Sequence, residues 1–322
     1  MAPGIAVAFA AAGYSVRIWG RSGERASAAL AAAKRDAELL EREGLAGAAT
    51  ETLERIDATD DLSAAVDDAG VIVEAITEDL EAKRELVALL EAVCAPAALI
   101  ATNTSGLRVS DIAAGAMSPG RIVAMHFWNP AHLMPIVEVA GGEHADDASV
   151  EHAVALSKCI GKVPVVIENE VLGFLGTRMQ QAVVREAIGL FQAGVASAQD
   201  IDLAVRTSFG VRFPVIGPLE ATDLGGLDVI ASIHEYLLED LDRSTSPQQA
   251  LAERVARGDL GVKSGKGFHD WSERDPAELV ARRDAELAQR LRQLADEGLI
   301  SPPIAAGGAA RLSCAVPTAR EK

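Results

Sequence analysis

Short apolar runs alternate with helical stretches over the first 167 residues of the chain. Glu24–Glu43 and Asp79–Val93 separate some of these runs and have the composition of helices. Strands that are apolar on both faces and separated by helices are typical of a mostly parallel sheet that is covered on both sides. We therefore predict a doubly wound α/β domain over residues 1–167. The predicted strands are Ser15–Trp19, Gly70–Ala75, Ala98–Thr102, Arg121–His126, Pro135–Ala140 and Lys162–Ile167.

The pattern changes after residue 167, where no further series of strands is visible. Leu175–Ala193 and Gly225–Asp240 predict long helices, and Ser197 begins a sequence that is typical of a helix N-terminus. We predict an all-α second domain over residues 168–272. Residues 273–322 form a third segment, in which a charged helix follows Asp275 and the Pro-, Ala- and Gly-rich tail at 301–322 is predicted to be disordered.

Length and charge narrow the possible functions. A chain of 322 residues exceeds the size at which one core usually keeps growing, which agrees with two domains. The formal net charge of −17 argues against nucleic acid and anionic membranes as partners, because both bind basic surfaces. No apolar run approaches the roughly 20 residues of a membrane span, and no signal-peptide pattern is present, so we expect a cytoplasmic protein. The three cysteines lack metal-site spacing, and we expect no metal.

The first residues carry part of a nucleotide-binding pattern. A small-residue helix, Ile5–Gly13, precedes the strand at Ser15. In a nucleotide-binding βαβ unit, such a helix follows a strand and a Gly-x-Gly turn that holds the pyrophosphate. That strand and turn are absent from the sequence, whereas Ala2 and Gly4 fit the later, close-packed positions of the motif. An ordinary Ala/Gly-rich helix explains the same residues equally well.

Polar residues stand at the carboxyl ends of predicted strands, where doubly wound sheets bind ligands. Asn103 and Ser105 follow Ala98–Thr102, and His126 ends another strand, where it can accept a proton near neutral pH. Glu138 interrupts the apolar run PIVEVA, and a buried carboxylate is costly unless it is paired. These residues indicate an acid–base pair. The alternatives are an Asn/Ser turn that only caps a helix and a glutamate that faces solvent on an edge strand.

Seven motifs together make the sequence resemble the 3-hydroxyacyl-CoA dehydrogenase family. The spacings of 21 residues from Ser105 to His126 and of 12 residues from His126 to Glu138 are those of the family. The resemblance extends to about Trp271 and does not depend on a single motif. The motifs are VEAITEDLEAK (73–83), ATNTSGL (101–107), HFWNP (126–130), VEV (137–139), GFLGTR (173–178), GPLEATDLGGLD (217–228) and LGVKSGKGFHDW (260–271).

The resemblance implies a Rossmann-type, NAD- or NADP-dependent oxidoreductase of fatty acid metabolism that acts at C3 of a 3-hydroxyacyl-CoA. His126 would take the hydroxyl proton, Glu138 would orient and polarise His126, and Ser105 would hydrogen-bond near the substrate oxygen. The family's all-α domain carries its dimer contact, so we expect a homodimer. The residues expected at the cofactor are Ala2, Gly4, Arg21, Ser22, Glu78, Lys83, Asn103, Asn129 and Lys263.

The sequence departs from the family pattern at four places. The first strand and its glycine turn are missing, for which we expect a mis-set start or a truncation. Arg21-Ser22 replaces the acidic residue that normally binds the ribose 2′-hydroxyl of NAD, which leaves NAD and NADP both open. Thr177 stands where the family has Asn, which puts its contact with the substrate carbonyl in doubt. Asp36 and Glu43 stand at positions that contact CoA in the CoA-using members.

Two other functions fit the same residues. A dehydrogenase of a free 3-hydroxy acid, of the carnitine or gulonate type, would use this scaffold without CoA. A non-catalytic binding protein that kept the fold is favoured by the missing turn and by Thr177. It is disfavoured by Ser105, His126 and Glu138, because a structural protein has no need for this set.

Overall fold

The computed structural model describes residues 1–300, and their contacts divide them into two compact units. Unit 1 consists of Met1–Thr177 together with the described residues from Ala281 onward, and unit 2 is Arg178–Val280. Residues 168–177, which the sequence analysis assigned to the second domain, therefore belong to unit 1. The part of the last described helix from Ala281 onward also belongs to unit 1. The tail that was predicted to be disordered lies outside the described residues.

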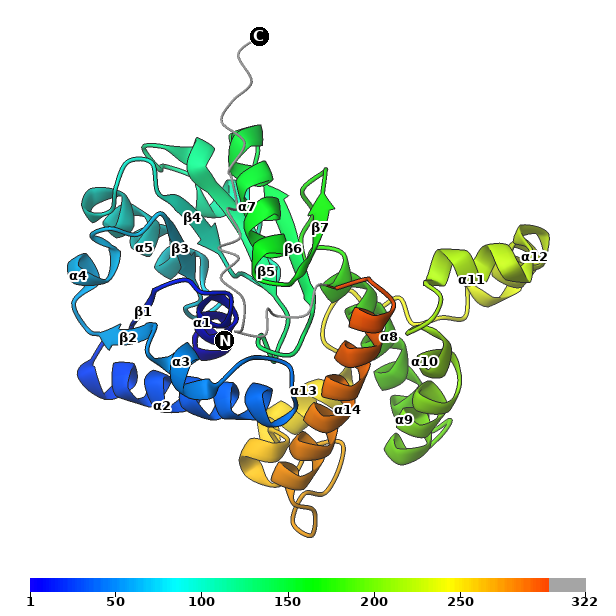
Figure 1. Cartoon of the computed structure of the whole chain (residues 1–322). Helices are drawn as coiled ribbons and strands as arrows, with labels where there is room; N and C mark the ends of the chain where they lie inside the picture. The colour runs from blue at the N-terminus through cyan, green and yellow to red at the C-terminus, as the bar shows by residue number, and fades with distance from the viewer. Residues whose placement is uncertain (301–322) are drawn as a thin grey trace. The chain divides into compact units, whose positions relative to one another are not determined.

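Unit 1 alternates strands and helices along the chain (Figure 1). Its strands are β1 (Val16–Trp19), β2 (Ile56–Thr59), β3 (Val71–Glu74), β4 (Leu99–Thr102), β5 (Ile122–Phe127), β6 (Ile136–Gly141) and β7 (Val163–Ile167). Its helices are α1 (Ala2–Ala11), α2 (Gly23–Arg42), α3 (Ala49–Leu53), α4 (Leu62–Val66), α5 (Leu80–Val93), α6 (Val109–Ile112), α7 (Asp147–Cys159) and the 3-10 turn η1 (Pro119–Arg121). The helix α14 (Pro276–Asp296) begins in unit 2 and ends in unit 1.

The strands of unit 1 form two sheets. The larger sheet has the order β3-β4-β5-β6-β7, and β1 and β2 pair separately. All pairs are parallel except β5 with β6, which run antiparallel and place His126 directly opposite Glu138. The α/β class and the mostly parallel sheet predicted from the sequence are confirmed.

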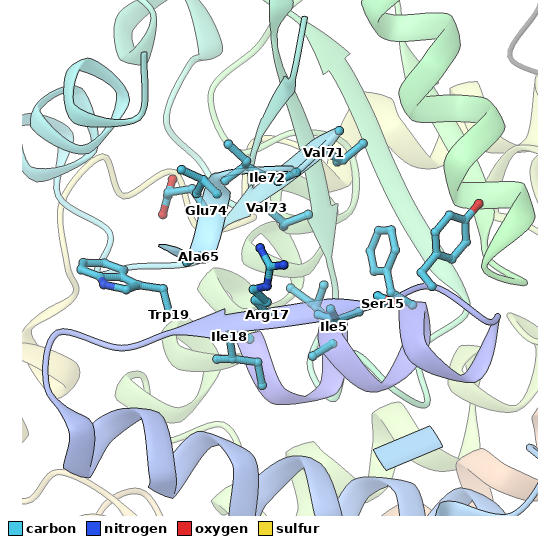
Figure 2. Close-up of a pocket in the computed structure, with 18 of the residues that line it drawn as sticks. Ile5, Ser15, Arg17, Ile18, Trp19, Ala65, Val71, Ile72, Val73 and Glu74 are labelled. Carbon is cyan, nitrogen blue, oxygen red and sulfur yellow. The ribbon is translucent and has the colours of Figure 1, made fainter. Parts of the chain in front are cut away.

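A cavity of about 770 Å³ lies between the two sheets, lined on one side by β1 and on the other by β3 (Figure 2). Both strands are sheet edges, and Val71, Ile72 and Val73 are only partly buried, whereas β4 is buried throughout. Apolar side chains of the helices α1, α4, α5 and α7 also line the cavity. The partial exposure of the apolar residues of β3 follows from its edge position, because an edge strand has no neighbour on one side.

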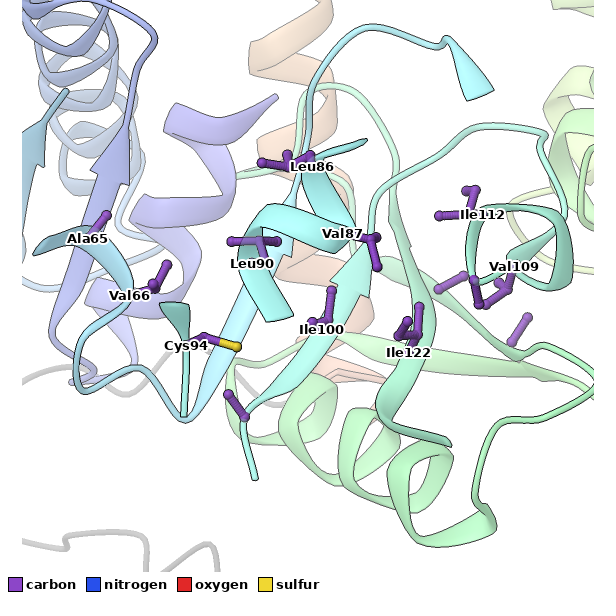
Figure 3. Close-up of a cluster of buried hydrophobic side chains, with 14 of the residues drawn as sticks. Ala65, Val66, Leu86, Val87, Leu90, Cys94, Ile100, Val109, Ile112 and Ile122 are labelled. Atoms are coloured by element: carbon purple, nitrogen blue, oxygen red, sulfur yellow. The ribbon is translucent and has the colours of Figure 1, made fainter. Parts of the chain in front are cut away.

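Helices cover the sheet because their apolar residues recur on one face. In α5, Leu86, Val87 and Leu90 point into one cluster with Ile100 of β4 and Ile122 of β5 (Figure 3). On α2, buried Ala26, Ala33, Ala37 and Leu40 form a stripe that packs in a cluster with α1 and with Ala288 and Leu291 of α14. Ser22 is the N-cap of α2, and its Oγ accepts a hydrogen bond from the Arg25 amide at 3.3 Å.

Unit 2 is helical, as the sequence predicts. Ser197 begins the second of its helices as an N-cap, with its Oγ accepting from the Asp200 amide at 3.1 Å. Its helices are α8 (Gly176–Gln192), whose first residues belong to unit 1, α9 (Ala198–Thr207), α10 (Phe209–Arg212), α11 (Pro218–Gly225), α12 (Leu227–Leu237), α13 (Gln249–Arg257) and the 3-10 turn η2 (Val262–Ser264). Among residues 1–300, no helix combines the length and the apolar character that crossing a membrane requires.

Candidate active site

The centre of the candidate site is a buried pair on neighbouring strands. His126 Nδ1 lies 2.7 Å from Glu138 Oε2, and the two residues are 5% and 1% exposed. The pairing of β5 with β6 fixes this contact, since the two residues are register partners. A carboxylate can only accept a hydrogen bond, so Nδ1 carries a proton, and in the neutral imidazole Nε2 then has the lone pair. The imidazole is therefore held in the tautomer that can take a proton at Nε2.

Glu138 receives four hydrogen bonds. His126 Nδ1 and Trp128 Nε1 donate to Oε2 at 2.7 and 3.0 Å, and the amides of Leu175 and Gly176 donate to Oε1 at 3.0 and 2.8 Å. Burial by itself raises the pKa of this carboxyl, but the hydrogen bonds from the imidazole, the Gly176 amide and the indole outweigh it and lower the pKa from 4.5 to about 2. The side chain is thus an anion throughout the physiological pH range.

This lowered pKa predicts a specific loss of stability in acid. The unfolded chain takes up the Glu138 proton near pH 4.5 and the folded chain only near pH 2, so the contribution is complete above pH 4.5 and disappears as the pH falls to 2. It amounts to about 3 kcal/mol of unfolding free energy at neutral pH. Urea unfolding of the wild type and of Glu138→Gln at several pH values measures it. We expect the difference between them to shrink steadily below pH 4.5, and a difference that does not change with pH would contradict this assignment.

The loop after β4 lies beside the pair. The register Thr102↔Ala124, continued along the parallel strands, brings residue 104 next to His126, and Asn103 Oδ1 accepts a hydrogen bond from the Phe127 amide at 2.8 Å. Asn103 is buried, so in this structure its amide links the ends of β4 and β5. Its expected contact with the cofactor stays a prediction.

Glu78 shapes the segment that carries Ser105. Its Oε1 accepts hydrogen bonds from Thr104 Oγ1 at 2.6 Å, from the Ser105 amide at 2.9 Å and from the Gly106 amide at 3.1 Å. The Ser105 side chain is left exposed, free to meet a ligand at the carboxyl end of the sheet.

Lys83 occupies a different place from the one its expected role suggests. Its side chain is fully buried, and its Nζ donates to both carboxylate oxygens of Glu74, at 2.8 and 3.0 Å. Glu74 also accepts from the Ile76 amide at 2.7 Å and from Thr102 Oγ1 at 2.7 Å, and Lys83 Nζ lies 3.5 Å from Glu78 Oε2. The pair supports the carboxyl ends of β3 and β4 from inside the fold.

Sequence reasoning missed Glu74, although a signal was present. Glu74 is a carboxylate inside the apolar strand run GVIVEA, the same feature that singled out Glu138. A lysine nine residues later, on the following helix, was the available partner.

A second buried lysine supports the turn that follows β5. Lys162 Nζ donates to the carbonyl oxygens of Ala131 at 2.8 Å and Met134 at 2.9 Å. Burial lowers the pKa of Lys162 to about 7. The side chain satisfies carbonyl groups that the turn would otherwise leave unpaired.

Four further residues that were expected at the cofactor lie at the start of α1 and after β1. Gly4 is buried, and a Cβ there would lie 3.1 Å from the backbone N and from Nδ1 of His132, so α1 approaches this turn closely. Ala2 lines the cavity. Arg21 and Ser22 are exposed at the turn after β1, and Ser22 also caps α2.

Asn129, Thr177 and Lys263 complete the set of expected site residues. Asn129 is exposed in the turn after Trp128 and precedes a cis peptide bond to Pro130. Thr177 is half-buried and follows Gly176, whose amide binds Glu138. Lys263 is exposed in η2 of unit 2. Their contacts with a ligand stay predictions.

Two family models match the chain. The one described as 3-hydroxyacyl-CoA dehydrogenase, NAD binding domain, matches residues 1–171, and the one described as 3-hydroxyacyl-CoA dehydrogenase, C-terminal domain, matches residues 173–271. The chain belongs to the 3-hydroxyacyl-CoA dehydrogenase family. The resemblance drawn from the seven motifs is confirmed, and with it the prediction of an oxidoreductase that uses NAD(P).

Known members of the 3-hydroxyacyl-CoA dehydrogenase family resemble the chain over most of its length. A probable 3-hydroxybutyryl-CoA dehydrogenase of Bacillus subtilis is 36% identical over 85% of this chain and 95% of its own. An L-carnitine dehydrogenase of Streptomyces coelicolor is 35% identical over 88% of each chain. Among solved structures, an NAD+-dependent 5-formyl-3-hydroxy-2-methylpyridine 4-carboxylic acid 5-dehydrogenase superposes with a TM-score of 0.85 at 29% identity, covering 91% of this chain and 94% of that one.

The donor set at the turn after β1 suits a phosphorylated nucleotide. β1 ends at Trp19, and the next residues are Gly20, Arg21 and Ser22, with no carboxylate among them. A Cβ on Gly20 would lie 2.7 Å from the Ala26 amide nitrogen, so the turn is tight and needs glycine. An exposed guanidinium beside a hydroxyl can pair with a phosphate, which fits NADP as well as NAD.

Proposed function

We propose that this protein interconverts a 3-hydroxyacyl substrate of the 3-hydroxyacyl-CoA type and the corresponding 3-oxoacyl compound, with His126 and Glu138 as its acid–base pair. The observation that carries the proposal is the buried contact of 2.7 Å between the two side chains at the carboxyl end of the sheet. Burial and a charged partner are the usual arrangement of a tuned acid–base pair.

In oxidation, His126 takes the proton of the C3 hydroxyl at Nε2. Glu138 stabilises the resulting imidazolium through Nδ1, because its charge is fixed next to the ring. The bound nicotinamide supplies the acceptor or donor of the hydride. In reduction, the same imidazolium returns its proton to the carbonyl oxygen. Ser105, exposed on the neighbouring loop, is proposed to hydrogen-bond to the substrate oxygen, and Thr177 is proposed to contact the acyl carbonyl.

A dehydrogenase of a free 3-hydroxy acid is the second candidate, and the surface of α2 favours it. Asp36 Oδ2 lies 3.4 Å from His132 Nδ1, and Glu43 Oε2 lies 3.7 Å from Arg292 Nη1, so acidic side chains are built into the region expected to meet CoA. The resemblance to an L-carnitine dehydrogenase points the same way.

Turnover with matched substrates separates the candidates. NADH or NADPH oxidation is measured with acetoacetyl-CoA, with free acetoacetate and with 3-dehydrocarnitine. Turnover that requires the CoA ester supports the first candidate, and turnover of a free acid alone supports the second. Turnover of none of the three, in folded protein, would favour the non-catalytic alternative.

Arg21 makes a prediction about the choice of nucleotide. If its guanidinium binds the 2′-phosphate, Arg21→Ala weakens NADPH binding by about tenfold, the value of one charge-assisted hydrogen bond, and leaves NADH binding unchanged. Fluorescence titration with both nucleotides measures this, and Arg35→Ala, an exposed arginine further along α2, is the matched control. An equal effect of Arg21→Ala on both nucleotides would contradict a role in reading the 2′-phosphate.

We also propose that the protein is a homodimer that uses unit 2. Large apolar side chains there, on α10–α12 and their connections, are between 46% and 80% exposed, which is unusual for a surface in contact with water only. These exposed side chains are Val211, Phe213, Val215, Leu219, Leu224, Leu227, Val229 and Tyr236. Sedimentation equilibrium is expected to give twice the chain mass, and a monomer at micromolar concentration would contradict the proposal.

A cytoplasmic location stays a prediction.

A further inference from the structure

Trp128 also contacts the acid–base pair, although the resemblance assigned it no role. It lies in the turn directly after β5, and its Nε1 donates to Glu138 Oε2 at 3.0 Å. The same oxygen receives His126 Nδ1 at 2.7 Å, and the rings of His126 and Trp128 have their centroids 6.0 Å apart. The indole and the imidazole therefore share one carboxylate oxygen.

Gly176 provides the space for this indole. A Cβ at Gly176 would lie 2.4 Å from Trp128 Cζ2, a separation that real side chains do not reach. The Gly176 amide, together with that of Leu175, donates to the other oxygen of Glu138. The carboxylate thus accepts hydrogen bonds from two side chains at Oε2 and from two backbone amides at Oε1. The indole packs directly against Gly176, which supplies one of those amides.

We propose that Trp128 is a positioning residue for the acid–base pair and that Gly176, which has no side chain, makes the room that the indole needs. The inference rests on the proposed function, but its physical content is independent of turnover. The indole N–H stops the carboxylate from rotating away from the imidazole. It shares the oxygen that His126 Nδ1 contacts, so the orientation of that carboxylate and the tautomer of the imidazole are fixed together.

Glu138 is the charged side chain that hydrogen-bonds to His126. From β6, Glu138 contacts Nδ1, and from the segment before α8, Phe174 lies with its ring centroid 5.5 Å from the imidazole. On the β4 side, Glu78 binds the loop at residues 104–106. A change in how Glu138 is held is therefore expected to be felt first at His126.

Trp128→Phe tests the hydrogen bond while keeping an aromatic ring. Without the N–H, the carboxylate loses one of the two donors at Oε2, and we expect it to hold the imidazole less firmly in the tautomer protonated at Nδ1. At neutral pH, kcat falls by about three- to tenfold while KM stays within twofold, because the substrate is not contacted.

Gly176→Ala tests the space and retains the amide donor. In the wild-type background the methyl group displaces the indole, so the variant reproduces the effect of Trp128→Phe or exceeds it. In the Trp128→Phe background the smaller ring leaves room, and the methyl group costs less. The double variant is therefore expected to be closer to Trp128→Phe alone than the product of the two single effects predicts. Independent, multiplicative effects would overturn the role of Gly176.

The deciding experiment is NMR on the whole chain, which needs no turnover. The indole N–H signal that disappears in Trp128→Phe identifies Trp128, and nitrogen shifts of the signal lost in His126→Gln report the tautomer and protonation of His126. We expect a slowly exchanging indole N–H that moves in Glu138→Gln, and a single His126 tautomer in the wild type that gives way to a mixture of tautomers in Trp128→Phe. A rapidly exchanging indole, or an unchanged tautomer in a folded Trp128→Phe variant, would overturn the proposal. Absence of dehydrogenase activity would remove the proposed function and leave this result standing.

Discussion

His126→Ala is expected to reduce kcat/KM by about 10²- to 10⁴-fold, the usual effect of removing a general acid–base group. The reason is geometric: His126 Nε2 is the ring nitrogen left available when Nδ1 is bound to Glu138 at 2.7 Å. Steady-state kinetics in both directions measure the loss. Binding of NADH is expected to be unchanged, because the role assigned to His126 is in proton transfer.

A matched variant separates this effect from a general effect of losing a histidine. His144 is exposed in the turn after β6, and His144→Ala is expected to retain full activity. Near-normal turnover of His126→Ala, with an unchanged melting temperature, would remove His126 from the mechanism.

Lys83→Met is expected to destabilise the fold by about 3–5 kcal/mol, the usual cost of leaving one member of a buried ion pair alone. Both side chains of the pair are 1% exposed, and the methionine would leave the Glu74 carboxylate without its cation. Urea unfolding measures the loss. Lys158→Met on the exposed face of α7 is the control, with an expected change within about 0.5 kcal/mol.

A second substitution shows whether the cost comes from the stranded charge. Glu74→Gln removes the charge and keeps one oxygen that can accept from the Ile76 amide, while its new NH2 group can donate to Thr102 Oγ1 in place of the second carboxylate oxygen. Lys83→Met combined with Glu74→Gln is therefore expected to recover more than half of the lost stability. If the double variant is less stable than Lys83→Met alone, the buried ion pair does not have the role described here.

The sequence predicted the parts of the fold that follow from local pattern. Six of the strands were visible because they are apolar runs bounded by helices and turns. The strand β2 was missed, since Ile56–Thr59 is short, contains Asp57 and lies between polar segments. The antiparallel pairing of β5 with β6 was not predicted either, because strand direction within a sheet depends on how the connection folds.

The candidate site was predictable where a charged residue in an apolar strand needed a partner. Glu138 was found because a carboxylate in an apolar strand needs a partner, and the structure supplies His126 on the next strand. Glu74 is also a carboxylate in an apolar strand, but its partner Lys83 was assigned to the cofactor by the resemblance. The contact of Trp128 with Gly176 could not be predicted, because it joins residues that are 48 positions apart and depends on side-chain packing.

Deuterium transfer tests most directly whether the protein moves a hydride between a nicotinamide and C3 of its substrate. The protein is incubated with acetoacetyl-CoA, and in parallel with the free 3-oxo acids, and with NADH or NADPH that carries deuterium at C4 of the nicotinamide. Mass spectrometry then locates the label in the product. We expect deuterium at C3 of the 3-hydroxy product in the wild type, and its loss by orders of magnitude in His126→Ala. No transfer from either coenzyme to any of these substrates, in folded wild-type protein, would contradict the proposed dehydrogenase activity.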